Sequence, residues 1–294
     1  MVQLRDGSIV CTSYAWLRLN ADALIKPAPR FTTVSRDNVY NFIGGYVLRS
    51  DDGGKSWKGP FRPASMPHPE AIDSFGDRVP MFNRGAMCEG ADGRLYWAAR
   101  SFADEISARH YRLHLLVSDD RGETWTKSCD IAADPKISFT ETSLIQTPRG
   151  DLVGFVRARR LERRGTLGAS DTLQGVPLSD HISVMVRSTD GGKSFQPWQD
   201  AGFFGFPFHA LRLPDGRVWV SYSYRKQPFG IRARILNAEC TDFGEAPEIV
   251  LRDDGGTSDV CYPWATLLPD GRILTVYWIN LNNGTRHIAG TICG

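Results

Sequence analysis

Two side chains of opposite charge stand 16 positions apart on the two strands of one predicted hairpin. Glu141 opens the first strand within 140–145, and Arg157 ends its partner at 152–157. Because hairpin strands run antiparallel, both side chains can reach the same end of the sheet. A carboxylate can take a proton, and a guanidinium fork binds a carboxylate through two hydrogen bonds. The alternatives are an exposed strand-end carboxylate and a solvated basic patch at 157–160.

Comparable positions in other predicted units carry further polar groups. Tyr262 and His209 open strands at 259–263 and 205–210, and Arg84 precedes a strand start at 85–87. Arg225 ends a strand, and Arg232 lies on the next one. Each residue also has a simpler interpretation: a half-buried packing tyrosine, a satisfied core histidine, a loop arginine or a surface charge.

A repeated motif predicts the scaffold that would bring these strand starts together. The pattern Ser-x-Asp-x-Gly-x-Ser/Thr-aromatic occurs at 50–57, 118–125 and 188–195, with starts 68 and 70 residues apart. Each copy follows a short apolar strand. The Asp can accept backbone N–H bonds, and the Gly supplies the positive φ of a tight turn. The motif therefore predicts stacked structural units and says little about chemistry.

A second hairpin signal, an Asp-Gly between apolar strands, alternates with the first. It occurs at 2–10, 92–97, 213–220 and 268–276, with a weaker copy at 147–153. Two hairpins make one unit of four antiparallel strands, and radial repetition of such sheets is a β-propeller. We expect an all-β fold with five four-stranded blades in a single domain, 1–294, at 1–60, 78–130, 138–200, 203–250 and 259–294. The fifth is about one strand short.

Composition excludes several classes of function. The formal net charge of the 294 residues is only +2, which gives no reason to expect nucleic acid or an anionic membrane as a partner. The chain has no long apolar run and starts without a signal-peptide pattern, so we expect a cytoplasmic protein, unless an upstream segment is missing. Six scattered cysteines indicate free thiols and no zinc site. We expect no metal and no organic cofactor; the oligomeric state stays open.

The boxes and their spacing resemble the sialidase superfamily of BNR or Asp-box propellers over nearly the whole chain. The resemblance implies a six-bladed family norm with a site at the central mouth. There, three arginines bind the substrate carboxylate, a tyrosine is the nucleophile, a glutamate activates it, and an aspartate is the acid/base. Sialic acid carries a carboxylate on its anomeric carbon. A neutral tyrosine avoids the repulsion that a carboxylate nucleophile would meet.

On this resemblance Tyr262 is the nucleophile and Glu141 its base. Arg157 and Arg225 bind the carboxylate, with Arg232 as the alternative to Arg225. The remaining site residues that the resemblance suggests are the acid Asp37 and two substrate contacts, Arg84 and His209.

The chain also departs from the family pattern. Pro263 stands where the family has a serine, and the first clamp arginine would fall before Met1. Only one further box separates Asp37 from Glu141, which indicates one unit fewer than six. The chain is either a five-unit form or lacks a first unit upstream.

The function expected first is therefore a sialidase-like glycoside hydrolase that acts on an anionic sugar. The alternatives are a non-catalytic carbohydrate-binding propeller and a carbohydrate lyase in which His209 and Tyr262 serve as acid and base.

Overall fold

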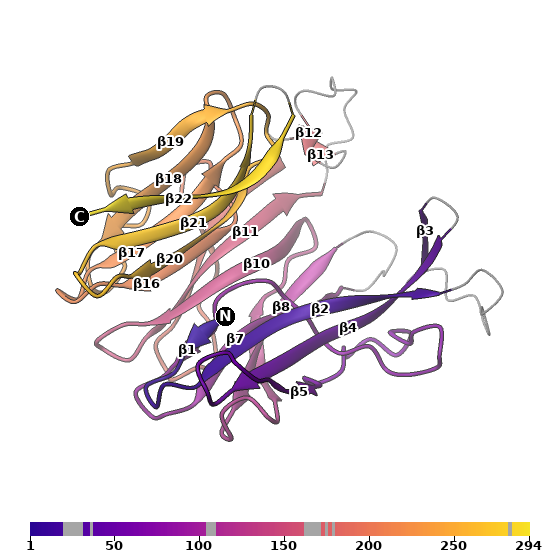
Figure 1. The fold of residues 1–294 in the computed structure, drawn as a ribbon. Coiled ribbons are helices and arrows are strands. Elements are labelled where there is room, and N and C mark those ends of the chain that lie inside the picture. Colours follow the sequence, from indigo (N-terminus) through magenta and orange to yellow (C-terminus); the bar gives the residue numbers. More distant parts are fainter. Residues whose placement is uncertain are drawn as a thin grey trace. The chain divides into compact units, whose positions relative to one another are not determined.

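The computed structural model describes residues 1–19, 32–35, 38–103, 110–161, 172–173, 176–177, 180–281 and 284–294. Every named element in these ranges is a β-strand (Figure 1). The chain divides into two compact units, Met1–Asp134 and Pro135–Gly294. The predicted all-β fold is confirmed: the large antiparallel sheets are five blades of a β-propeller, two in the first unit and three in the second.

The first unit holds two blades. The first contains β1 (Val2–Gln3), β2 (Ile9–Leu19), β4 (Asn38–Ser50) and β3 (Thr32–Ser35) in this order, with β5 (Lys58–Phe61) also paired to β4. The second contains β6 (Cys88–Glu89), β7 (Leu95–Phe102), β8 (Tyr111–Ser118) and β9 (Thr126–Ala132). One apolar core, which includes Phe42, Phe82 and Trp97, joins the two sheets.

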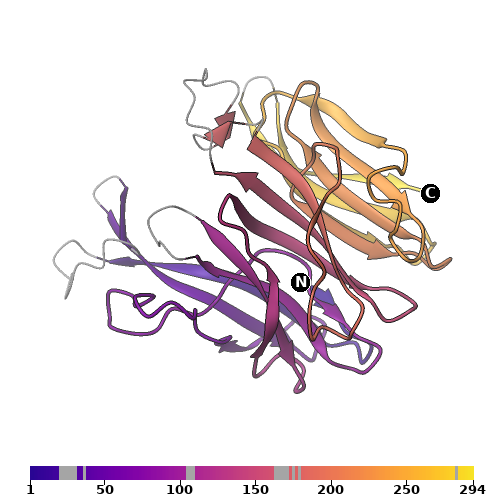
Figure 2. The same ribbon diagram turned by 180° about the vertical axis from the view of Figure 1, so that it is seen from behind.

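The second unit holds three blades, drawn from pink to yellow in Figures 1 and 2. The first contains β10 (Ile137–Gln146), β11 (Leu152–Arg160), β14 (His181–Ser188) and β15 (Gln199–Asp200), with a separate pair β12 (Thr172–Leu173) and β13 (Val176–Pro177). The next contains β16 (Phe208–Arg212), β17 (Val218–Tyr224), β18 (Phe229–Leu236) and β19 (Ile249–Gly255). The last contains three strands, β20 (Cys261–Leu267), β21 (Ile273–Asn280) and β22 (Arg286–Cys293), as its sequence predicted.

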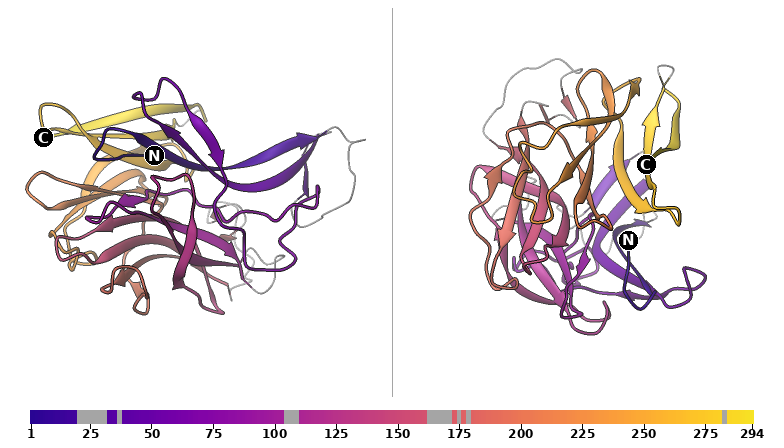
Figure 3. Two further views of the ribbon diagram at one scale, coloured as in Figure 1. Left: turned by 90° about the horizontal axis from the view of Figure 1, so that it is seen from below. Right: turned by 90° about the vertical axis from the view of Figure 1, so that its left-hand side faces the viewer.

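The opening strands of the second unit's blades lie side by side. Strand β16 contacts both β10 and β20, and Figure 3 shows these sheets from two further directions. The backbone N–H of Ala210 donates to Ser143 Oγ at 3.0 Å, and that of Ala265 donates to His209 Nδ1 at 3.1 Å. A side chain on one opening strand thus fixes the backbone of the next. This arrangement brings the starts of three sheets close together.

The box turns have the geometry that their sequence predicts. In the second box Asp120 accepts hydrogen bonds from Ser118 Oγ at 2.8 Å and from the Thr124 backbone at 2.8 Å. Ser118 Oγ in turn accepts the Gly122 N–H at 2.8 Å, and Gly122 has φ +94°. The first and third boxes repeat these bonds around Asp52 and Asp190. The boxes are local turn structures that set the ends of strands.

No helix in the described residues is long and apolar enough to span a membrane. No group of three or more His, Cys, Asp or Glu side chains in that part of the chain is placed to hold a metal ion.

Candidate active site

A tyrosine and a glutamate that lie 121 residues apart meet in the second unit. Tyr262 Oη donates a hydrogen bond of 2.9 Å to Glu141 Oε1. Glu141 comes from β10 and is only 8% exposed, whereas Tyr262 lies at the start of β20 and is half-buried. A phenol that donates to a carboxylate is already positioned to lose its proton to that carboxylate. The pair is therefore placed for proton transfer from the phenol to the carboxylate.

Both residues sit where their strands are irregular. Tyr262 has a φ of +53°, in the left-handed region that a bulky residue seldom adopts. The register of β20 with β21 breaks between Cys261 and Trp264, and that of β10 with β11 breaks between Phe139 and Thr142. Bulges of this kind re-aim side chains out of the regular alternation of a strand. The two irregularities thus direct the phenol and the carboxylate to a common point.

Arg157 reaches the same carboxylate from the paired strand of the hairpin. Its Nη1 lies 3.4 Å from Glu141 Oε2, and both side chains are largely buried. The predicted meeting of these two residues across the hairpin is confirmed. Glu141 therefore has a phenol on one oxygen and a guanidinium on the other. A positive charge thus lies beside the carboxylate that accepts the phenolic hydrogen bond.

Arg225 contacts the residue that precedes Tyr262. It follows β17, is 4% exposed, and donates through Nη2 to the Sγ of Cys261, the residue before Tyr262. Burial raises the pKa of the Cys261 thiol, although the charge of Arg225 acts in the opposite direction. The Nε of Arg225 is buried and has no hydrogen-bond partner among the described residues.

One aromatic ring connects the two arginines. The guanidinium carbon of Arg157 lies 4.8 Å from the centroid of the Phe206 ring, and that of Arg225 lies 5.6 Å from it. Phe206 itself is fully buried. Contacts of this kind hold a cation without occupying its hydrogen-bond donors. The structure thus brings together four predicted site residues, Glu141, Arg157, Arg225 and Tyr262.

His181 belongs to this site, although sequence reasoning missed it. It opens β14 opposite Arg159, is 5% exposed, and stacks on Phe206 with ring centroids 4.5 Å apart. Both ring nitrogens are buried and have no hydrogen-bond partner in the described part of the chain. Burial, together with Arg157 and Arg225, lowers the pKa of His181 to about 3, so its ring is neutral at pH 7. Its place at a strand start, beside the basic run at 157–160, was the signal available in the sequence.

Arg232, the alternative to Arg225, has structural partners. Its guanidinium donates to the Pro228 carbonyl at 3.1 Å and to the Arg252 carbonyl, and lies 3.5 Å from Glu248. It is 3% exposed. Arg225 is therefore the arginine of this blade that lies beside the Tyr262 segment.

His209 also makes structural contacts. Its ring stacks on Trp264 at 4.3 Å, and its Nδ1 accepts the Ala265 N–H that joins two blades. Burial lowers the pKa of His209 to about 3. Its predicted contact with a ligand stays a prediction.

Two predicted residues belong to the first part of the chain. Arg84 lies in the first unit, where its guanidinium covers the Tyr14 ring at 4.5 Å. Asp37, the predicted acid, lies outside the described residues. Their roles stay predictions.

The chain is similar in sequence and in fold to several known proteins. The BNR/Asp-box repeat family matches residues 116–127, the segment of the second box. The structure resembles the NanB sialidase of Streptococcus pneumoniae with a TM-score of 0.56 at 16% identity, covering 86% of this chain and 36% of that one. It also resembles an α-L-arabinanase of Penicillium chrysogenum with a TM-score of 0.62 at 16% identity, covering 98% and 78% of the two chains. The chain carries a BNR/Asp-box repeat, and its fold is a β-propeller like that of these two proteins.

A nearer relative defines the family. A protein of unknown function from Dyadobacter fermentans DSM 18053 is 47% identical, with a TM-score of 0.84 over 99% of this chain and 74% of that one. The chain belongs to the same family as this Dyadobacter protein. A xyloglucanase of Paenibacillus sp is 26% identical over 227 residues, which are 73% of this chain. The chain spans only a fifth of the length of that xyloglucanase.

Proposed function

We propose that this protein is a sialidase-like glycoside hydrolase that cleaves an anionic sugar through a tyrosine nucleophile. The observation that carries the proposal is the 2.9 Å hydrogen bond from Tyr262 Oη to Glu141 Oε1. It joins the two residues that the family resemblance assigns to nucleophile and base. The fold shared with glycoside hydrolases supports a carbohydrate ligand.

The proposed reaction has two steps. In the first, Tyr262 Oη attacks the anomeric carbon while Glu141 takes the phenolic proton, and the glycosidic C–O bond breaks as the leaving oxygen receives a proton from an acid, assigned to Asp37. In the second, a water molecule gives a proton to the carboxylate of the same acid, assigned to Asp37, and attacks the same carbon. The bond to Tyr262 breaks, and the proton on Glu141 returns to the phenolate. Two inversions retain the anomeric configuration.

The charges of the site support an anionic substrate. Arg157 and Arg225 both lie against Phe206; Arg157 is half-buried and Arg225 is buried. Two guanidinium groups near one phenol can bind a carboxylate attached to the anomeric carbon. A neutral phenol can approach that carbon without the repulsion a carboxylate nucleophile would meet. We assign Arg157 and Arg225 to the substrate carboxylate.

The contacts of His209 favour the hydrolase over the lyase alternative. A lyase would need His209 to exchange a proton with the substrate. The Nδ1 of this residue instead accepts the Ala265 N–H, and burial lowers its pKa to about 3. A general acid or base works best with a pKa near the working pH.

Hydrolysis of 4-methylumbelliferyl sialosides, with other anionic and neutral 4-methylumbelliferyl sugars for comparison, tests the proposal. Tyr262→Phe should lower kcat on the order of a thousandfold or more, because a phenylalanine ring cannot form the covalent bond. Tyr96→Phe is the matched control, since Tyr96 Oη also donates to a carboxylate, Asp92, at 2.8 Å in a hairpin of the first unit. Binding without hydrolysis by the wild-type chain would support the non-catalytic alternative and overturn the proposal.

A further inference from the structure

Both ring nitrogens of His181 are buried without a structural use. The side chain is 5% exposed, and neither Nδ1 nor Nε2 has a hydrogen-bond partner among the described residues. A neutral imidazole offers one N–H donor and one acceptor nitrogen, and leaving buried polar atoms unpaired raises the free energy of the folded state. Native proteins pair almost all such atoms, so a ring that stays unpaired in the free chain points to a ligand.

The other buried histidines in the described part of the chain use their ring nitrogens. His114 lies 2.7 Å from Ser101 Oγ through Nε2 and 2.8 Å from Asp130 Oδ1 through Nδ1. His209 accepts a backbone N–H of the next blade through Nδ1. These two rings connect strands and blades of the fold. His181 makes no comparable bond, although it is buried to the same degree as His209.

A second unpartnered donor lies beside the same aromatic ring. Arg225 is 4% exposed, and its buried Nε has no hydrogen-bond partner in the described ranges. The His181 ring lies 4.5 Å from the centroid of Phe206, and the guanidinium carbon of Arg225 lies 5.6 Å from it. Arg157 lies 4.8 Å from the same centroid. The cluster of Arg157, His181 and Arg225 around Phe206 therefore holds donors that a single bound acceptor can satisfy.

Positive charge dominates around the His181 ring. Besides burial, which is the largest cause, the charges of Arg157, Arg225 and Arg159 lower the pKa of His181, and only Glu141 acts in the opposite direction. Glu141 is itself engaged, because it accepts the Tyr262 phenol and contacts Arg157. An acceptor that carries a negative charge therefore suits this cluster.

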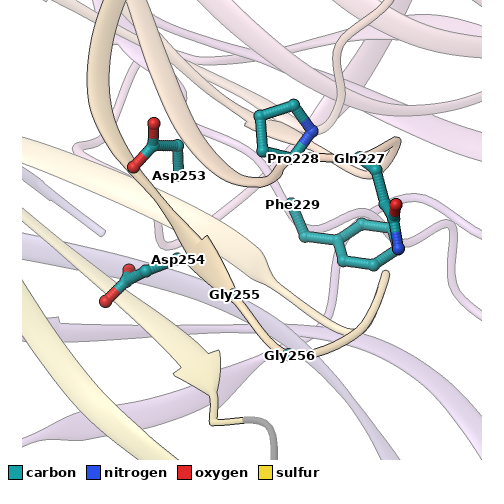
Figure 4. A pocket seen from close by; sticks show the side chains of 7 residues that line it. All are labelled: Gln227, Pro228, Phe229, Asp253, Asp254, Gly255 and Gly256. Carbon is teal, nitrogen blue, oxygen red and sulfur yellow. The ribbon is translucent and has the colours of Figure 1, made fainter.

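The cavity shown in Figure 4 is a poorer place for an anionic group. It has a volume of about 540 Å³. The residues that line it are Gln227, Pro228, Phe229, Asp253, Asp254, Gly255 and Gly256. Its two charged side chains are both carboxylates, and Asp254 is already paired with Arg252 at 2.6 Å. A lining with no basic side chain does not attract an anion. The anionic group of a ligand is therefore expected at the cluster around Phe206.

We propose that His181 is a further substrate-binding residue, which donates its ring N–H to the carboxylate of the anionic sugar beside Arg157 and Arg225. The inference rests on the proposed function, because it assumes that an anionic sugar occupies this cluster. The ring nitrogens are covered in the free chain, so binding includes a side-chain movement. The half-buried Arg157, which lies 3.4 Å from Glu141, turns toward the ligand carboxylate and uncovers the His181 ring. The neutral ring then adds a directional donor without a further positive charge.

Binding to the full chain carrying Tyr262→Phe tests the contact without turnover. The probes are the methyl glycosides of N-acetylneuraminic acid and of galacturonic acid, each compared with its own carboxamide by calorimetry. We expect a carboxylate probe to bind. His181→Phe, which keeps a ring against Phe206, should weaken it about tenfold or more and weaken the carboxamide less, because hydrogen bonds to charged groups are the stronger ones. The matched control His287→Phe, at a half-buried histidine of β22, should leave both affinities unchanged.

Two further measurements separate a ligand contact from a structural role. In the chain labelled with ¹⁵N-histidine, the ring N–H signal of His181 should shift when the carboxylate probe binds, and that of His287 should not. His181→Asn and His181→Gln place an amide N–H near the position of Nδ1 and of Nε2, respectively. One of these two variants should recover part of the affinity that His181→Phe loses.

Each outcome decides the proposal. Carboxylate binding that His181→Phe leaves unchanged, or an unshifted His181 signal, overturns the inference and leaves the proposed function intact. Equal losses for carboxylate and carboxamide that neither amide variant recovers also overturn it. Binding that depends on His181, in a wild-type chain that hydrolyses no 4-methylumbelliferyl sugar, overturns the proposed function and keeps the contact. Failure of both carboxylate probes to bind overturns both. Unfolding midpoints equal to that of the parent show that the variants are folded.

Discussion

The box turns and the site around Tyr262 differ in how their polar groups are paired. In the box at 118–125, polar groups find partners within a few residues: Asp120 accepts from Ser118 and Thr124, and Ser118 accepts from Gly122. At the site, the pairing register of β20 with β21 breaks around Tyr262, and that of β10 with β11 breaks around Glu141. His181 and Arg225 keep buried nitrogen atoms without partners in the described part of the chain.

This difference separates the groups that fold the chain from those that act on a ligand. Unpaired buried polar atoms and left-handed backbone at a bulky residue each raise the free energy of the folded state. Such features cluster where function requires them. The hydrogen bonds of the box turns stabilise the fold, apart from the left-handed Arg121, whereas the unpartnered nitrogens and the left-handed Tyr262 of the site lower its stability.

The largest effect is expected at Glu141. Glu141→Gln keeps the size and one acceptor oxygen but cannot take the phenolic proton, so kcat should fall about a hundredfold to ten-thousandfold. The change in KM should be small. Steady-state kinetics of the purified chain measures both. Asp151→Asn is a control on the same sheet. Asp151 forms an ion pair with Arg187 at 2.8 Å, in the 147–153 turn that joins β10 to β11. Equal losses of kcat in both variants would remove the special role of Glu141.

The next effect is expected at two buried histidines, which make the unfolding free energy depend on pH. His181 and His209 are each 5% exposed, and the pKa of each is lowered to about 3. Because the folded-state pKa lies below the unfolded value of 6.5, the unfolded chain binds more protons between these values, and stability falls as pH decreases through that window. Each histidine should cost about 2 kcal/mol of unfolding free energy between pH 7 and pH 5. His181→Phe and His209→Phe should each remove one such loss in urea titrations.

The same two variants should differ in their unfolding free energy at pH 7. His209→Phe leaves the buried Ala265 N–H without an acceptor and should cost about 1–3 kcal/mol of unfolding free energy. His181→Phe removes only nitrogen atoms without partners, so the unfolding free energy should stay the same or increase. KM should rise. Equal destabilisation by both substitutions would show that His181 has a structural partner like that of His209.

Sequence reasoning succeeded where interactions are local. The box turns and Asp-Gly hairpins depend on residues a few positions apart, so five blades and the meeting of Glu141 with Arg157 could be predicted. The contact of Tyr262 with Glu141 required the family resemblance, because blade packing brings these residues together. The unpartnered ring nitrogens of His181 and the bonds of Arg232 to backbone carbonyls could not be predicted. Both depend on which backbone groups tertiary packing leaves within reach of the side chain.

A smaller effect is expected in the second box. Asp120→Ala should cost about 1 kcal/mol of unfolding free energy, as the loss of a capping side chain does in helices. Although partial burial opposes it, hydrogen bonds from Thr124 and Ser118 lower the pKa of Asp120 below 3.8. The stabilisation is therefore present above pH 3.8 and is lost as pH falls through the lower folded-state pKa.

Urea titrations of the wild type and Asp120→Ala at pH 7 and pH 3 measure this contribution. The difference between the two chains should shrink at the lower pH. Neighbouring Asp119 makes an exposed ion pair with Arg94, so Asp119→Ala should change the unfolding free energy by less than about 0.5 kcal/mol. A cost at Asp119 equal to that at Asp120 would contradict the specific role of the box aspartate.

The smallest effect is a gain of stability. Arg121 has φ +60° where the other two boxes have Gly53 and Gly191, both at φ +73°. Arg121→Gly should raise the unfolding free energy by about 0.5 kcal/mol, since relief of left-handed strain exceeds the loss of an exposed ion pair with Asp6. Thermal unfolding detects the change, and kcat should not move. Destabilisation would mean that the Asp6 pair outweighs backbone strain.

Covalent trapping tests the central claim most directly. An activated 3-fluoro sialosyl fluoride should react with the wild-type chain and add one glycosyl unit in intact-mass spectrometry, with the adduct on the peptide that contains Tyr262. Tyr262→Phe should remain unmodified, and Tyr96→Phe should react like the wild type. An adduct on another residue, or hydrolysis of the probe by Tyr262→Phe at the wild-type rate, would contradict the tyrosine mechanism.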